Sequence, residues 1–97
     1  MEKLINVMND VLHQWKEQYD LIYNIPLQFE LDANQHLSLK GKSLDLPEYA
    51  ELKCVDFDIE QITFHFSDGC RIYIDIAWPE NNAPYVNTVL VGYIFKE

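Results

Sequence analysis

The most constraining feature of this sequence is a change of hydrophobic period near Pro26. Over residues 2 to about 23, apolar residues recur every three or four positions and polar residues fall on the opposite side, which predicts an amphipathic helix with one buried face. Asn24 suits the helix end, and Pro26 prevents its continuation. The predicted buried stripe consists of Leu4, Ile5, Met8, Val11, Leu12, Trp15, Tyr19 and Ile22.

After the helix the period becomes two, which indicates strands with one apolar face. Residues 25–31 and 37–39 predict a hairpin, the stretch 40–43 breaks its pattern, and residues 44–47 predict a short edge strand or an extended connection. Residues 52–57 predict a further strand with its apolar side chains inward. The apolar residues then move from odd positions (55, 57 and 59) to even positions (62, 64 and 66). This change of parity between Asp58 and Gln61 requires a turn or a bulge.

The hairpin around Gly69 can be placed in register by sorting its faces. A two-residue turn at the Asp-Gly dipeptide would put apolar residues of one strand opposite polar residues of the other. A three-residue loop at 67–69, with Gly69 in the left-handed conformation, pairs Phe64 with Ile72 and keeps the faces separate. This register predicts a polar face made of Gln61, Thr63, His65, Arg71, Tyr73 and Asp75.

The last third of the chain completes the predicted fold. Residues 78–85 are a loop by composition, and residues 86–95 are apolar at nearly every position. Such a run predicts a central strand covered on both sides, with a terminal helix left open. We therefore expect a single α+β domain over residues 1–97, in which one long N-terminal amphipathic helix packs on a five- to six-stranded, mostly antiparallel curved sheet.

The charge balance limits the kinds of partner. Seven basic residues face sixteen acidic ones, for a net charge of −9. Binding to nucleic acid or to an anionic membrane needs a basic patch, and the few basic residues here are scattered, so neither is expected. A strongly acidic protein is attracted to basic proteins. The competing explanation is that net charge serves only solubility.

Location and chemistry can also be addressed from the sequence. The amino terminus lacks the pattern of a signal peptide, so we expect a cytoplasmic protein in which Cys54 and Cys70 are reduced thiols that behave as small buried apolar residues. No pair of metal ligands has the short spacing of a zinc site, and no glycine-rich phosphate loop or nucleophile motif is visible. We predict no metal site, no cofactor and no enzymatic activity.

These expectations lead to a binding protein. The leading hypothesis is an immunity protein or antitoxin that neutralises a basic, nuclease-type toxin by stoichiometric binding. The predicted contact surface combines the polar sheet face, the acidic segment 45–60 and the loop 78–85. Its residues are Asp45, Glu48, Glu51, Asp56, Asp58, Glu60, His65, Arg71, Tyr73, Asp75, Trp78 and Tyr85.

Two other functions remain open at this point. One is a phage-encoded inhibitor that mimics nucleic acid and blocks a host defence complex, which needs the same acidic surface. The other is a small-molecule-binding or enzymatic domain whose pocket lies between helix and sheet and is lined by Trp15, Tyr19, Tyr73 and Tyr93. A homodimer formed through an exposed strand edge is also left open.

Overall fold

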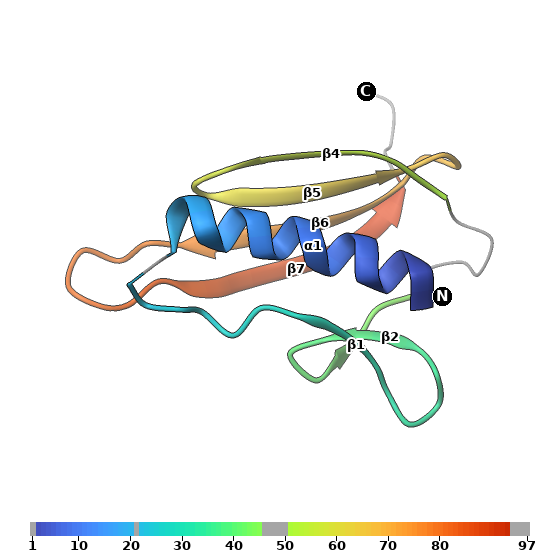
Figure 1. The fold of residues 1–97 in the computed structure, drawn as a ribbon, viewed down its shortest axis with the longest axis horizontal. Helices are drawn as coiled ribbons and strands as arrows, with labels where there is room; N and C mark the ends of the chain where they lie inside the picture. Colours follow the sequence, from blue (N-terminus) through green and yellow to red (C-terminus); the bar gives the residue numbers. More distant parts are fainter. Residues whose placement is uncertain (1, 21, 46–50, 94–97) are drawn as a thin grey trace.

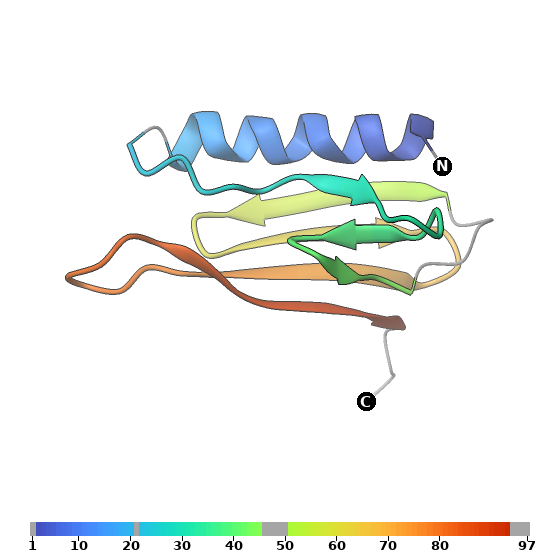
Figure 2. The same ribbon diagram turned by 90° about the horizontal axis from the view of Figure 1, so that it is seen from below.

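A computed structural model describes residues 2–20, 22–45 and 51–93 of the chain. They form two layers (Figures 1 and 2). One layer is a curved antiparallel sheet of four strands in the order β4-β5-β6-β7, here called the large sheet. The other layer consists of helix α1 and a three-stranded antiparallel sheet, β1-β2-β3, here called the small sheet. The α+β class with antiparallel strands is therefore confirmed.

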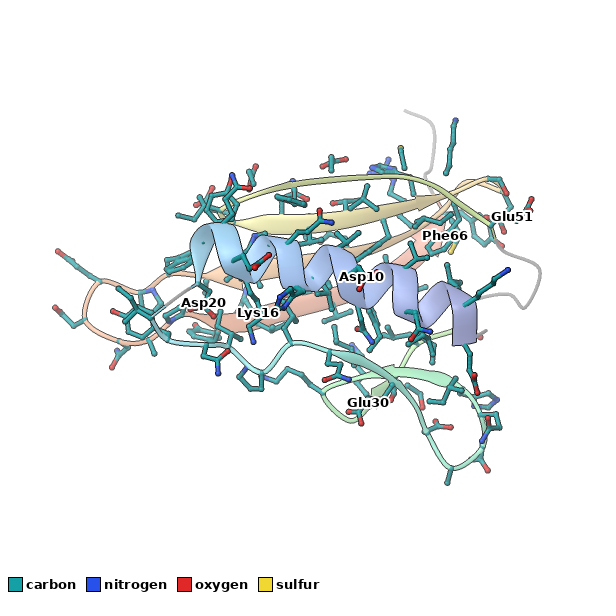
Figure 3. All side chains as sticks on the ribbon, in the orientation of Figure 1. Asp10, Lys16, Asp20, Glu30, Glu51 and Phe66 are labelled. Atoms are coloured by element: carbon teal, nitrogen blue, oxygen red, sulfur yellow. The ribbon has the colours of Figure 1, made fainter. Side chains whose placement is uncertain are left out.

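Helix α1 runs from Glu2–Tyr19, somewhat shorter than the pattern predicts. Its buried side chains, Ile5, Met8, Leu12 and Trp15, all belong to the predicted stripe and lie against the large sheet. Ile22 was also predicted in this stripe, but it falls beyond the helix and is 86% exposed, so that part of the prediction is wrong. The helix ends early because the buried Asp20 carboxylate accepts hydrogen bonds from the backbone N–H groups of the next turn (Figure 3). These bonds replace helical ones and turn the chain back over the sheet. The N–H donors are those of Tyr23, Asn24 and Ile25.

The small sheet contains β1 (Phe29–Leu31), β2 (Leu37–Leu39) and β3 (Lys42–Ser43). The first two strands form the predicted hairpin. The third strand was not predicted: Lys40 and Gly41 both have positive φ, which is the conformation of a tight two-residue hairpin turn. The break predicted at 40–43 is therefore a turn at 40–41 followed by strand β3. Residues 44 and 45 are not in a strand, which agrees with the extended connection, one of the two alternatives for 44–47, and residues 46–50 lie outside the described part of the chain.

The large sheet contains β4 (Leu52–Asp58), β5 (Gln61–Phe66), β6 (Cys70–Ala77) and β7 (Tyr85–Tyr93). The parity flip is a two-residue turn between Asp58 and Gln61, which pair with each other. The predicted register of β5 and β6 is confirmed, with Phe64 opposite Ile72. Gly69 has a φ of 93° and its N–H donates to the Phe66 carbonyl, as expected for the three-residue loop.

Strand β7 differs from its prediction. It is a strand and not a helix, but it lies at the edge of the large sheet, and no residue of it falls in the buried class. The prediction of a central strand covered on both sides is therefore wrong. Alternation is present along the strand, since Thr88, Leu90 and Gly92 lie on one side and Val89 and Val91 on the other. The apolar composition of this segment hides that alternation.

The described residues form seven strands in two sheets, where we expected a single sheet of five or six strands. The physical reason is that the β1–β2 hairpin packs its apolar side on the large sheet and does not extend its hydrogen-bonded ladder. Phe29 makes an edge-to-face contact with Phe64, with ring centroids 5.4 Å apart. The side chain of Asn9 binds both the N–H and the carbonyl of Phe29, at 2.7 and 3.0 Å, and so joins α1 to the edge of β1.

The two parts of the second layer share one face of the large sheet. In Figures 1 and 2, α1 lies over β4 and β5, and the small sheet lies over the half nearer β7. Trp15 is fully buried about one turn before the C-terminal end of the helix, and its indole N–H donates to the Asp58 carbonyl at 2.7 Å. The other face of the large sheet has no layer over it among the described residues. No helix in this part of the chain is long and apolar enough to cross a membrane.

Replacing Trp15 with Phe is expected to lower the free energy of unfolding by about 1–3 kcal/mol, because an aromatic ring remains but the Asp58 carbonyl loses its donor. Trp78→Phe is the matched control. Its indole N–H donates to the Ile59 carbonyl at 2.6 Å in a more exposed place, so its loss is expected to be smaller, about 0.5–1.5 kcal/mol. Urea denaturation measures the free energy of unfolding of both variants. Equal losses would contradict the expectation that the Trp15 hydrogen bond stabilises the fold more than the Trp78 hydrogen bond.

Candidate functional site

The candidate site is the outer face of the large sheet, which points away from α1 and the small sheet. Strand pairing places side chains from all four strands on it in three cross-strand rows. Because side chains alternate along each strand, these residues share one face while the core residues share the other. The outer face consists of Cys54, Asp56, Asp58, Gln61, Thr63, His65, Arg71, Tyr73, Asp75, Thr88, Leu90 and Gly92.

A hydrogen-bonded chain fixes the first carboxylate of this face. His65 Nε2 lies 2.7 Å from Asp56 Oδ2, and Gln61 Nε2 donates to the other oxygen of Asp56 at 3.1 Å. Thr63 in turn donates to Gln61 Oε1 at 2.5 Å. The bond from His65, supported by that from Gln61, lowers the pKa of Asp56 below the ordinary 3.8. The carboxylate is therefore held both ionised and oriented at neutral pH.

A second carboxylate is fixed on the neighbouring strands. Asp75 accepts a bond from the Tyr73 hydroxyl at 3.3 Å and one from Asn87 Nδ2 at 3.0 Å. Partial burial, followed by the charge of Asp75, raises the pKa of Tyr73 above its ordinary 10. Tyr73 is therefore a neutral hydrogen-bond donor over the physiological range.

Arg71 is the one arginine of the protein, and it lies on the same face directly opposite His65, in the cross-strand row at the end of the face away from Asp75. Its Nε is buried and has no hydrogen-bond acceptor, and no ion pair joins it to a carboxylate among the described residues. Gly92 is its cross-strand neighbour on β7, and a Cβ built on Gly92 would meet only open space. None of the described residues therefore forms a hydrogen bond or an ion pair with this guanidinium, whose Nε is closed to solvent.

The predicted contact residues do not all meet at this face. Asp56, Asp58, His65, Arg71 and Tyr73 do so, together with Asp75. The structure thus joins the predicted polar face to two members of the acidic segment.

The remaining predicted residues lie elsewhere. Glu60 is in the β4–β5 turn, and Glu51 lies at the opposite end of β4, near Phe66 (Figure 3). Asp45 is exposed in the segment that follows β3, and Glu48 lies outside the described residues.

The two predicted aromatic contacts from the loop also separate. Trp78 packs against the core, with its ring centroid 6.3 Å from that of Trp15. Tyr85 begins β7 opposite Ala77 and is 48% exposed. The acidic segment and the loop are therefore not single surfaces.

Two further corrections concern the cysteines and the alternative pocket. Cys70 is buried as expected, but Cys54 is exposed on the outer face, directly opposite His65. Its position one strand residue before Val55, an inward side chain, could have revealed this. Trp15 and Tyr19 lie on the core side of the large sheet and Tyr73 on the outer side, so they do not line one cavity.

Sequence reasoning also missed the part of the face that β7 supplies. Leu90 stands opposite Tyr73 and is 58% exposed, and Thr88 stands opposite Asp75. The polar interruptions at Asn87, Thr88 and Gly92 in an otherwise apolar run were the available signal. Within the described ranges, no three His, Cys, Asp or Glu side chains are grouped so that they could hold a metal ion.

Comparison with known proteins gives no relative, since no family model, no curated protein and no solved structure matches this chain significantly. The function must therefore be inferred from the chemistry of the outer face.

The Asp56 network predicts a pH-dependent stability. A lowered pKa in the folded state stabilises the fold above the unfolded value of 3.8, and this contribution is lost as the pH falls through the folded value. Near neutral pH, Asp56→Asn is expected to be less stable than wild type by at most about 1 kcal/mol, because the side chain is largely exposed. The difference should shrink as the medium becomes more acidic than 3.8.

Urea denaturation over a pH series measures this difference. Asp10→Asn, on the exposed side of the helix, is the control. A stability gap between Asp56→Asn and wild type that stays constant, or grows, in acid would contradict the assignment.

Proposed function

We propose that this chain is a binding protein that recognises a cationic protein through the outer face of the large sheet. In its most concrete form, it is an immunity protein or antitoxin that occupies the basic substrate site of a nuclease-type toxin. The observation that carries this proposal is a sheet face that none of the other described elements covers, with three carboxylates, those of Asp56, Asp58 and Asp75, and a single guanidinium.

The distribution of charge supports a cationic partner. Residues 51–93, which form the large sheet and its loops, contain seven acidic residues and two basic ones. Residues 2–45, which form the other layer, contain seven acidic residues and four basic ones. The excess of negative charge is thus greater on the large sheet, and a potential of this kind steers a basic partner toward it and raises the association rate.

The carboxylates are ready to accept bonds from a partner. The Asp56 side chain is 63% exposed although two of its neighbours already bind it, and a carboxylate has about four acceptor positions. Its orientation is fixed before binding, so a partner's arginine or lysine would not have to order it. Asp75 is half-buried, and its orientation is likewise fixed before binding, because its two bonds come from its own sheet.

The middle of the face supplies apolar contact beside this charge. Tyr73 and Leu90 are cross-strand neighbours, and Leu90 is 58% exposed. Tyrosine and arginine are enriched among the residues that carry most of the binding energy in protein interfaces. An aromatic and aliphatic centre with charged groups around it is the usual anatomy of such an interface.

The test uses two bait proteins with the same net charge. Asp56→Asn with Asp75→Asn removes two carboxylates from the outer face, while Asp10→Asn with Glu17→Gln removes two from the exposed side of the helix. Wild type and both variants are immobilised and exposed to extract from the source cell, and retained proteins are quantified at low and high salt. A basic protein retained by wild type is then purified for titration.

We expect the outer-face variant to bind this protein about tenfold or more weakly, equivalent to about 1.4 kcal/mol, and the helix variant to bind almost as well as wild type. Loss of nuclease activity of the partner at a one-to-one ratio would identify the toxin-inhibitor form. Equal weakening by the two variants would show that only net charge matters and would contradict the assignment of the outer face.

A further inference from the structure

Strand β7, which lies at the edge of the large sheet as far as the structure describes the chain, has an unusual composition for an edge strand. Its nine residues, Tyr85–Tyr93, include no charged side chain and no proline. Three of its large apolar side chains are substantially exposed, at 47–58%. Natural proteins normally protect long edge strands with charges, prolines or a covering segment. The three exposed side chains are those of Tyr85, Leu90 and Tyr93.

The opposite edge of the same sheet is protected in the ordinary way. Strand β4 carries Lys53, Asp56 and Asp58, and its pairing is irregular between Leu52 and Cys54. Charges and bulges of this kind discourage pairing with another chain. The two edges of one sheet therefore differ, and only the β7 edge has kept a surface suited to pairing.

On its side away from β6, the backbone of β7 pairs with no other strand among the described residues. The Val89 carbonyl accepts a bond from Lys42 Nζ at 3.3 Å, an exposed contact with a flexible side chain. This carbonyl thus points away from β6, and backbone alternation in an antiparallel ladder gives Val91 the same direction. An incoming strand can replace the lysine and bond to both residues.

We propose that the β7 edge binds an extended segment of the partner protein, which adds a fifth strand to the large sheet. In this mode, backbone hydrogen bonds provide affinity and alternate side chains provide specificity. The side chains of the added strand would alternate between the inner side, beside Val89 and Val91, and the outer side, beside Leu90. Apolar residues of the added strand fit the inner side, and basic residues fit the outer side. The choice of basic residues rests on the proposed function.

A second copy of this chain fits the edge less well. Two β7 strands paired antiparallel about a twofold axis would place both small sheets on the same side of the joined sheet. Figures 1 and 2 show the small sheet above the half of the large sheet nearer β7, and Lys42 of β3 reaches the edge itself. The small sheets of two copies would therefore meet, whereas a single extended segment passes beside β3.

The test uses two blocked nine-residue peptides as probes. One alternates valine with lysine, and the other alternates valine with threonine. Amide chemical shifts and hydrogen exchange of the wild-type protein are recorded with each peptide at up to millimolar concentration. We expect both peptides to protect the amides of Val89 and Val91, and the lysine peptide to bind about tenfold more tightly because the outer face is acidic.

The outcomes separate the edge from the acidic face. If the lysine peptide binds without protecting any β7 amide, the edge proposal is overturned while the proposed function stands. If both peptides protect β7 equally, the edge proposal holds and the electrostatic part of the proposed function fails. If neither peptide binds, the edge proposal is overturned. If the β7 amides become protected as the protein concentration rises without peptide, the edge pairs with a second copy of the chain, and the proposal is overturned as well.

A pair of proline variants gives an independent measurement. Val89→Pro removes an edge N–H of β7, and Val55→Pro is its control in β4 at the opposite edge. We expect Val89→Pro to weaken the peptide at least about tenfold and Val55→Pro to leave the affinity unchanged. Equal peptide affinity of Val89→Pro and wild type would overturn the proposal. If either variant fails to fold, the hydrogen-exchange data on the wild-type protein test the proposal instead.

Discussion

The hydrogen bond from the buried Trp15 indole to the Asp58 carbonyl determines how the two layers meet. It joins the C-terminal part of α1 to the turn between β4 and β5, and Trp78 donates to Ile59 in the same turn. An indole is buried cheaply only where its N–H finds an acceptor, so this contact fixes the helix over one half of the large sheet. The other half needs a different cover, and the small sheet supplies it. Asn9 completes the layer by binding the backbone of Phe29.

Because both covering elements lie on one face, the chain has nothing left among its described residues to cover the other. An antiparallel sheet tolerates this when its second face is polar. The polar side chains here are bonded to one another, with Asp56 held by His65 and Gln61, and Asp75 held by Tyr73 and Asn87. Such bonds remove conformational freedom before any partner arrives, which lowers the entropic cost of binding.

The predictable and unpredictable parts of this fold differ in a physical way. The register of β5 and β6 followed from face sorting, because a shift by one residue would expose Phe64 and its neighbours. The position of β7 could not be found in this way, since a nearly continuous apolar run does not reveal which side is covered. Strand β3 was not predicted because Lys40 adopts a positive φ, a conformation that is uncommon for lysine and cannot be read from its side chain. On the outer face, residues of β5 and β6 were predicted together. Leu90 was missed because the apolar run does not show how β7 pairs with β6, and Cys54 was missed although the inward direction of its neighbour Val55 already implies an outward side chain.

The outer face and the β7 edge would bind a partner through different forces. Contacts with Asp56 and Asp75 are between charges near the surface and weaken as salt screens them. Backbone pairing at Val89 and Val91 is between neutral groups and is nearly independent of salt. The two sites adjoin, because Leu90 belongs to both the face and the edge strand. A basic segment that pairs with β7 would therefore lay its charged side chains across the face, so that electrostatic steering brings the partner in and backbone pairing sets how slowly it leaves.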